Sequence, residues 1–353
     1  MKNGANFFTR AAVLVSTSLF LVSCGNTGAL DSAAGGAGSE AAGDNIVITY
    51  NTPEKWGNYG KVLDAFEAET GIAAPNDPKN SGQTLAALQA EKSSPVADVA
   101  YVGIAFAEQL ENAGVLQPYK PAGTEEVDPN LKDPDGNWTT VHAGTVAFIV
   151  NEDHLDGAPV PKSWADLLKP EYAGKVGFLD PTQAAVGYSV ATAANIAMGG
   201  DLDNWDPGFE YLKKLKDNGA IISAQTATAK VAQGEIPILI DADFNGYQLK
   251  DEGANVTLVI PEEGSLRIPY VVGLVNGAPH EENGKKLLDF YFTEEGQALF
   301  AEGFMGPAVG SIPDQVKDSF LPDADYERAV TIDYLKQGEV QQDFNARYRK
   351  EMS

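Results

Sequence analysis

The chain has 353 residues and a formal net charge of −25, with 43% hydrophobic and 21% charged residues. This length is sufficient for two lobes, each with its own core. The acidic charge argues against nucleic acid and anionic lipid headgroups as partners, because both would be repelled. The single cysteine excludes an internal disulfide.

The N-terminus is predicted to direct export. Residues 1–23 carry Lys2 and Arg10, followed by an apolar run that is too short to span a bilayer, as in a lipoprotein signal peptide. The run ends in "LVSCG", which resembles the bacterial lipobox, in which the cysteine is lipidated and becomes the new N-terminus. Residues 24–45 are rich in Gly, Ala and Ser, which predicts a flexible tether. We therefore expect an exported protein, lipid-anchored through Cys24 and facing the extracellular or periplasmic side.

The first part of the body alternates strand and helix signals. A β-rich run is followed by two helical patterns, then a short apolar strand and a third helix; these segments cover residues 45–51, 59–71, 81–94, 97–103 and 105–119. Ser81 is a plausible N-cap of the second helix. This order predicts an α/β fold with a largely parallel sheet.

Two long β-prone runs divide the rest of the chain. They cover residues 140–155 and 268–279, with alternating helix and strand signals between them and two helical patterns after Pro279. The simplest topology joins two α/β lobes through these runs. The predicted first lobe comprises residues 46–146 and 272–312, the second residues 147–271, and residues 313–353 form C-terminal helices packed on the lobes.

The stretch "DADFNGYQLKDE", residues 241–252, matches the calcium-loop pattern D-x-[DN]-x-[DN]-G-x5-E. A calcium loop of that type needs a helix on each side. Upstream, however, Pro237 and a β-branched run favour a strand, and Gly253 with another strand-like run follows downstream. We therefore interpret the match as accidental and predict a strand that ends at Asp241, followed by a helix.

Several segments together resemble a known family. They are "AFEAETGI", "LQAEKSSPVADVAYV", "ENAGVLQPY", "PKSWADLLKPEYAGKVGFLDP", "VAQGEIPILID" and "IPYVVGLVNGAPHEENGKKLLDFYFTEEGQALFAE". Their order over about residues 46–312 resembles the extracellular solute-binding proteins of bacterial ABC importers, in the group for ferric ion, polyamines, thiamine and 2-aminoethylphosphonate. The resemblance implies a two-lobed periplasmic-binding-protein (Venus flytrap) fold with two strand crossovers as its hinge.

The resemblance also implies the partners. They are a small-molecule solute, the permease and ATPase subunits of the importer, and the membrane through the lipid on Cys24. We expect a monomer without a cofactor and without resident metal.

In open α/β sheets, ligands bind beyond the carboxyl ends of strands, where helix N-termini present free N–H groups. This rule and the resemblance select the candidate ligand-binding residues Trp56, Ser81, Gly82, Tyr101, Thr182, Gln183, Asp241, Asp243, Phe244 and Tyr270. We expect one helix to open at Ser81 and another at Pro181. For each Ser or Thr the alternative is an ordinary helix cap, and for each aromatic residue it is core packing. Asp241 has the further alternative of capping the helix that follows it.

Ferric-binding relatives carry two adjacent metal-binding tyrosines, and this sequence has Asp243 and Phe244 at those places. Phe244 cannot bind a metal, which weakens the iron alternative, although Tyr101, Tyr247 and Tyr270 remain candidates. A carboxylate suits an ammonium group, and aromatic side chains could surround that cation, including Tyr59. We therefore expect an amine-bearing solute, either a polyamine or 2-aminoethylphosphonate.

An enzyme on this fold is the alternative of a different class. The sequence contains no G-x-S-x-G, no H-E-x-x-H and no Cys–His set, and His142, His154 and His280 are dispersed. We therefore expect a binding protein rather than an enzyme, with a sensor or adhesin on the same fold as a further alternative.

Overall fold

The computed structural model describes residues 45–224 and 227–352. The predicted signal peptide, Cys24 and the tether as far as residue 44 lie outside these ranges. Within them, every helix is too short or too polar to cross a bilayer.

The strands form one hydrogen-bonded sheet in the order β2-β1-β3-β10-β5-β8-β6-β7. In addition, β4 and β12 pair with β10, whereas β9 and β11 pair with β5. Pairing is parallel within β2-β1-β3 and β7-β6-β8 and antiparallel around β5. β10 pairs antiparallel with β3, β4 and β5 and parallel with β12. The strands are β1 Thr49–Tyr50, β2 Asn76–Asp77, β3 Val99–Gly103, β4 Leu116–Gln117, β5 Thr139–Asn151, β6 Val176–Leu179, β7 Ile221–Ser223, β8 Ile238–Ala242, β9 Val256–Val259, β10 Ser265–Val275, β11 Gly306–Pro307 and β12 Ala329–Val330.

The two longest strands connect the two parallel groups. β5 pairs with β10 up to Thr145, then with β8 from Val146 onward, while β10 pairs with β3 from Tyr270 to Leu274. The sheet is therefore continuous through β5. The division into lobes at residues 146/147 and 271/272 stays a prediction.

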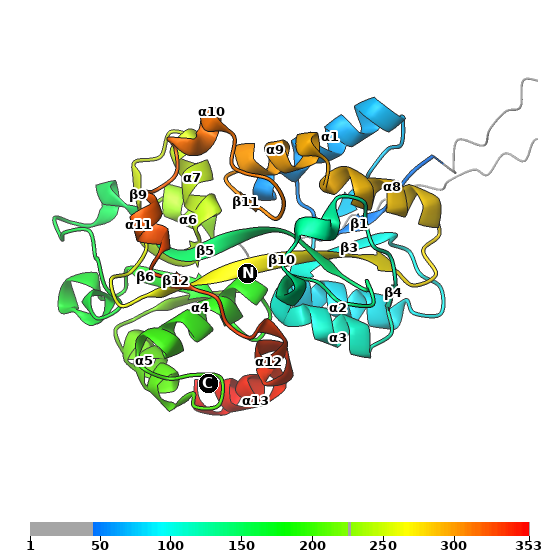
Figure 1. The fold of residues 1–353 in the computed structure, drawn as a ribbon. Helices are drawn as coiled ribbons and strands as arrows, with labels where there is room; N and C mark the ends of the chain where they lie inside the picture. The colour runs from blue at the N-terminus through cyan, green and yellow to red at the C-terminus, as the bar shows by residue number, and fades with distance from the viewer. Residues whose placement is uncertain (1–44, 225–226, 353) are drawn as a thin grey trace, which may run out of the picture. The chain divides into compact units, whose positions relative to one another are not determined.

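The helices flank this sheet (Figure 1). They are α1 Tyr59–Thr70, α2 Ser81–Ala90, α3 Ala107–Asn112, α4 Ala185–Ala197, α5 Asp206–Asp217, α6 Thr228–Ala232, α7 Asp243–Asp251, α8 Glu281–Tyr291, α9 Glu294–Glu302, α10 Asp314–Lys317, α11 Asp323–Tyr326, α12 Tyr334–Glu339 and α13 Gln341–Glu351. Short 3-10 turns cover Trp56–Asn58, Ile104–Phe106, Thr124–Glu126, Pro129–Leu131, Glu152–His154, Asp166–Leu168 and Pro170–Tyr172. The two helices expected after Pro279 are α8 and α9.

α4 is the most enclosed of these helices, with every residue from 185 to 195 buried. Its apolar sequence fits this position between the sheet and neighbouring helices. The C-terminal helices α12 and α13 lie beside α4 and α5 in Figure 1. The Tyr188 hydroxyl donates to the Gln337 carbonyl, and the Phe344 ring lies 4.7 Å from that of Trp205.

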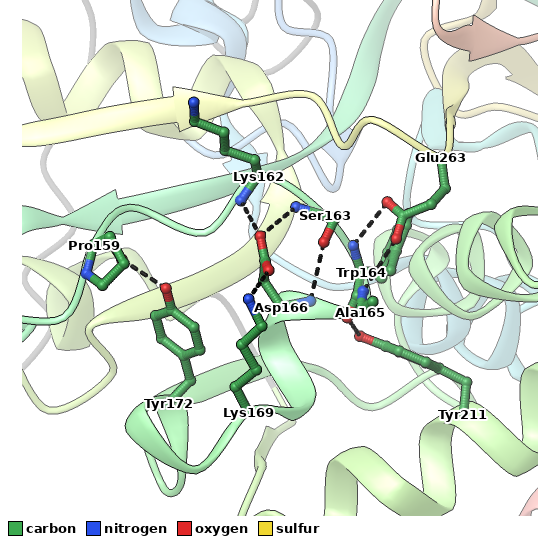
Figure 2. Close-up of polar contacts among 10 residues, drawn as sticks. All are labelled: Pro159, Lys162, Ser163, Trp164, Ala165, Asp166, Lys169, Tyr172, Tyr211 and Glu263. Atoms are coloured by element: carbon green, nitrogen blue, oxygen red, sulfur yellow. Dashed lines mark hydrogen bonds and ion pairs between the residues drawn. The ribbon is translucent and has the colours of Figure 1, made fainter.

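The first part of one family-like segment, which covers residues 161–181, is held by a polar network (Figure 2). The Asp166 carboxylate accepts from the backbone N–H groups of Lys162 and Ser163. Glu263, in the β9–β10 connection, accepts from the N–H groups of Trp164 and Ala165. Because these bonds satisfy backbone donors outside regular structure, the segment is a structural anchor for that connection.

Candidate ligand-binding site

A cavity of about 600 Å³ lies where several strand ends and helix starts meet. Its walls come from the segment after β1, the starts of α2 and α4, helices α6 and α7, and the side chains of Tyr101 and Tyr270. This volume lies within the range of small-molecule sites. The position agrees with the rule that ligands bind beyond the carboxyl ends of strands.

One wall of the cavity is aromatic. Tyr101 and Tyr270 stack with centroids 5.5 Å apart, and Trp56 meets Tyr270 edge-on at 5.8 Å. The indole Nε1 of Trp56 donates to the Tyr101 hydroxyl at 2.9 Å. Trp56, Tyr101 and Tyr270 line the cavity, whereas Phe244 packs behind Trp56, 4.8 Å away. The structure thus brings three of the five predicted aromatic residues to the cavity, and Tyr59, like Phe244, is absent from the described lining residues.

The start of α2 forms a second wall, and here one prediction is wrong. Asn80, not Ser81, is the N-cap: its side chain accepts from Gln83 N–H, and Gln83 Oε1 accepts from Asn80 N–H. Ser81 is the first helical residue and lines the cavity, with its Oγ accepting from Gly103 N–H at 3.2 Å. Its hydroxyl proton can therefore be donated elsewhere. Gly82 lies outside the lining, and its N–H points to the Gln183 carbonyl at 3.4 Å.

The helix predicted to open at Pro181 begins instead at Ala185. The Asp180 carboxylate accepts from Thr182 N–H, Thr182 Oγ–H and Gln183 Nε2, which holds this stretch as a turn. Thr182 and Gln183 are consequently absent from the described residues that line the cavity.

In their place, the start of α4 lines the cavity with the three small residues Ala184, Ala185 and Val186. The N-cap, Ala184, makes no side-chain capping bond, so the first-turn N–H groups have no side-chain acceptor there. Sequence reasoning missed these residues, because alanine and valine give no polar signal.

The strand-to-helix prediction at residues 241–252 is confirmed: β8 ends at Ala242 and α7 begins at Asp243. The N-cap position belongs to Ala242, so Asp241 does not cap this helix. Asp241 is fully buried, and its Oδ1 accepts from Ala242 N–H at 2.7 Å and from Asn245 Nδ2 at 3.1 Å. Burial raises the pKa of this carboxyl group to about 7.

Asp243 is also buried, and three donors occupy its carboxylate. Oδ1 accepts from the N–H groups of Thr145 at 2.8 Å and Phe244 at 3.0 Å, and Oδ2 accepts from the Tyr326 hydroxyl at 3.0 Å. Burial raises its pKa to about 6. Neither Asp241 nor Asp243 is among the described residues that line the cavity. Contact of Asp243 with a ligand stays a prediction.

The face of α7 that does line the cavity carries Asn245, Gln248, Leu249 and Glu252. None of these was selected from the sequence. Their spacing of three to four residues along one helix face was the available signal, and it could be used only once the helix itself was established.

Among the described lining residues, the charged side chains are Lys55, Lys79 and Glu252. Lys55 Nζ and Glu252 Oε1 are 2.8 Å apart. Lys79 pairs with Asp77 just outside the lining, and its Nζ lies 4.1 Å from the centroid of the Tyr50 ring. The lining therefore carries one more cation than anion, although the chain as a whole is at −25.

Behind the aromatic wall lies His142, fully buried, with no hydrogen-bond partner for either ring nitrogen among the described residues. Burial lowers its pKa to about 3, so it is neutral. Burial also raises the pKa of Tyr101 and Tyr270 well above the ordinary value, which disfavours the phenolate forms that ferric ion would need. Within the described ranges, no three His, Cys, Asp or Glu side chains are grouped to hold a metal.

Comparison with solved structures defines the class of fold. The periplasmic binding protein AfuA from Actinobacillus pleuropneumoniae, with fructose-6-phosphate bound, superposes with a TM-score of 0.76 at 23% identity, covering 87% of this chain and 98% of that one. Iron-bound HitA from Pseudomonas aeruginosa gives 0.68 at 22% identity, covering 86% and 98%. The chain therefore has the α/β fold of periplasmic binding proteins, as predicted.

Comparison of sequences defines the family. Residues 94–338 match the family described as bacterial extracellular solute-binding protein. A putative 2-aminoethylphosphonate-binding periplasmic protein of Salmonella paratyphi A is 33% identical over 263 residues, covering 72% of this chain and 74% of that protein. The spermidine/putrescine-binding periplasmic protein of Escherichia coli is 24% identical over 330 residues, covering 89% and 91%.

The chain belongs to the bacterial extracellular solute-binding protein family. This membership supports the role of substrate-binding component of an ABC importer, outside the cytoplasmic membrane. These relatives are named as binding proteins, not as enzymes.

Proposed function

We propose that the solute is a small zwitterion with a phosphonate group and an ammonium group, of the 2-aminoethylphosphonate class. The observation that carries this proposal is that the carboxylates at the lining already have lysine partners: Glu252 is paired with Lys55, and Asp77, just outside the lining, with Lys79. A polycation such as spermidine would need several carboxylates there to offset its desolvation. An anion with a single amine matches the lining better.

The starts of α2 and α4 suit the phosphonate end. α4 begins without a side-chain cap and directs its first-turn N–H groups toward this region, whereas in α2 the N–H groups of Gly82 and Gln83 already have acceptors. Both helices direct the positive end of a helix dipole here, which favours anions. Ser81 can add a hydroxyl donor, and Lys79 a nearby positive charge. The relatives named for 2-aminoethylphosphonate support the same chemistry.

Calorimetry and thermal shift on the purified body test this proposal with 2-aminoethylphosphonate, ethylphosphonate, spermidine and ferric citrate. A ligand that binds the folded state, present at a concentration of a hundred times its Kd, stabilises that state by about 2.7 kcal/mol. We expect that stabilisation with 2-aminoethylphosphonate and none with spermidine. Binding of spermidine or ferric ion alone would replace the proposal with one of its alternatives.

The solute is delivered to the permease and ATPase subunits by a monomer anchored through Cys24. The lipobox-like "LVSCG" and the lone cysteine support the anchor. Cys24→Ser should release the protein into the medium or periplasm with ligand affinity unchanged, which fractionation and calorimetry measure. Membrane retention of the Ser variant would exclude lipidation as the anchor.

A further inference from the structure

Asn245 is placed to present an acceptor to the cavity. It is 2% exposed, lines the cavity, and its amide nitrogen donates to Asp241 Oδ1 at 3.1 Å. A side-chain amide has a donor end and an acceptor end. Since the nitrogen is turned toward Asp241, the oxygen is the end left for the cavity.

Asp241 holds this orientation because its Oδ1, which accepts from the Ala242 N–H, also accepts from the Asn245 amide and cannot pair with an amide oxygen. Its Oδ2 has no partner among the described residues, and none of their ion pairs includes Asp241. The nearby Tyr270 hydroxyl likewise lacks a partner there, although Tyr270 lines the cavity. A buried carboxylate without a counter-charge is costly, and a cation in the cavity would offset that cost.

We propose that Asn245 and Asp241 form the subsite for the ligand's ammonium group. Asn245 Oδ1 accepts a hydrogen bond from the ammonium directly. Asp241 is a positioning residue: it fixes the amide and supplies a buried negative charge behind it. The proposal rests on the proposed function, because it assigns the amine end of the same solute.

The other carboxylates near the cavity are already engaged. Three donors occupy Asp243, including the Tyr326 hydroxyl at 3.0 Å. Glu252, whose side chain is 45% exposed, is paired with Lys55 at 2.8 Å, and Asp77 is paired with Lys79. Asn245 is therefore the buried residue on α7 whose side-chain oxygen can still accept a hydrogen bond from the cavity.

The test compares two ligands that differ only in the amine, 2-aminoethylphosphonate and ethylphosphonate, by calorimetry. We expect Asn245→Leu to weaken 2-aminoethylphosphonate about ten- to a hundredfold, the range for a hydrogen bond to a charged group, and ethylphosphonate less than about threefold. Asp241→Asn should weaken 2-aminoethylphosphonate about tenfold, because a second amide allows the Asn245 amide to reverse. Asp243→Asn tests the competing carboxylate. Asp251→Asn, exposed on α7 and outside the described lining, is the control and should leave the ratio of the two affinities unchanged.

The outcomes separate the two proposals. If the unsubstituted protein binds neither phosphonate, the proposed function and this subsite both fail. If it binds both, and Asn245→Leu weakens them equally or Asp243→Asn alone changes the ratio, this subsite alone is wrong. Thermal melts confirm that each variant is folded, and Asn245→Ala replaces the Leu variant if that one is not.

Discussion

The side chains of Lys55 and Glu252, 197 residues apart in sequence, form an ion pair of 2.8 Å beside the cavity. Lys55 follows β1 and Glu252 is the C-cap residue of α7, so the pair links two different walls of the site. The side chains are 79% and 45% exposed, so solvent screens their attraction.

Glu252→Gln should therefore lower the free energy of unfolding by less than about 1 kcal/mol. Because the pair links two walls of the site, we expect the substitution to accelerate ligand release by up to about fivefold. Stopped-flow fluorescence of the tryptophan residues measures the rate of release. Glu210→Gln, which breaks the exposed Lys214 pair on α5, is the control and should leave release unchanged. A loss of more than about 2 kcal/mol in Glu252→Gln would make the pair a structural element instead.

A second prediction concerns the close approach of β3 and α4. A Cβ atom at Gly103 would lie 2.4 Å from the Ala185 Cβ, far inside contact distance. Gly103→Ala should therefore separate the end of β3 from the start of α4 and weaken ligand binding at least about tenfold, since both border the cavity. Calorimetry measures the loss, and Gly103→Ala with Ala185→Gly should recover most of it. Failure of that rescue would show that the contact between the two Cβ atoms is not the cause.

A third prediction is that the contribution of Asp241 to the stability of the fold falls as the pH rises. Its folded-state pKa of about 7 exceeds that of the unfolded chain, about 4. The folded protein therefore holds a proton in this window that the unfolded chain releases, and the contribution of Asp241 to stability falls as pH rises from 4 through 7. Asp241→Asn lacks this dependence, so its melting temperature relative to wild type should be higher at pH 8 than at pH 5.

The exposed Asp64→Asn is the control for that comparison. Melting curves by circular dichroism at the two pH values give the difference for each variant. A constant difference between Asp241→Asn and wild type would mean that Asp241 does not change protonation over this range.

For His142 we expect the opposite pH dependence of stability. Its folded-state pKa of about 3 lies below the unfolded value of about 6.5, so the unfolded chain takes up a proton that the folded protein excludes. Stability is therefore lost as pH falls below about 6.5. His142→Phe fills the same aromatic surroundings without a titrating group, and its unfolding free energy relative to wild type should rise between pH 7 and pH 4.5. Urea unfolding measures this, with the exposed His154→Gln as control; an unchanged difference would contradict the assignment.

The elements that the sequence predicted well are those with strong local patterns. β5 and β10 are long β-branched runs, and the 281–302 region has two apolar periodicities separated by Thr293, which caps α9. The start of α4 was misplaced because Asp180 satisfies local donors and delays the helix to Ala185. The sequence shows that an Asp side chain is present to accept hydrogen bonds from nearby backbone N–H groups. It does not show whether that side chain will hold a turn or cap a helix.

The candidate site was predicted less completely than the fold. Aromatic residues stand out in sequence, and Trp56, Tyr101 and Tyr270 line the cavity. The acidic pair at 241 and 243 was equally conspicuous, yet it lies behind the lining, and Asn245 faces the cavity in its place. Which face of α7 turns inward depends on packing against the sheet, a long-range property that spacing alone does not determine.

The last prediction concerns the bond between Tyr326 and Asp243. The Tyr326 hydroxyl donates to Asp243 Oδ2 at 3.0 Å and lies 2.8 Å from the Tyr247 hydroxyl, so it links α11 to α7. A hydrogen bond to a charged group contributes about 1.5–3 kcal/mol, against about 0.5–1.5 kcal/mol for a neutral acceptor. Tyr326→Phe should therefore cost more stability than Tyr334→Phe, whose hydroxyl donates to the neutral Arg267 carbonyl at 2.8 Å.

The pH dependence of that cost identifies the acceptor. Tyr326 stabilises the ionised form of Asp243, whose pKa is about 6, so the cost of Tyr326→Phe should be larger at pH 8 than at pH 5. Tyr334→Phe should show no such change, because its acceptor does not titrate. In an Asp243→Asn background, urea unfolding should give the same cost for Tyr326→Phe at both pH values. If the cost still rises with pH in that background, a group other than Asp243 is responsible, and the link between α11 and α7 depends on different chemistry.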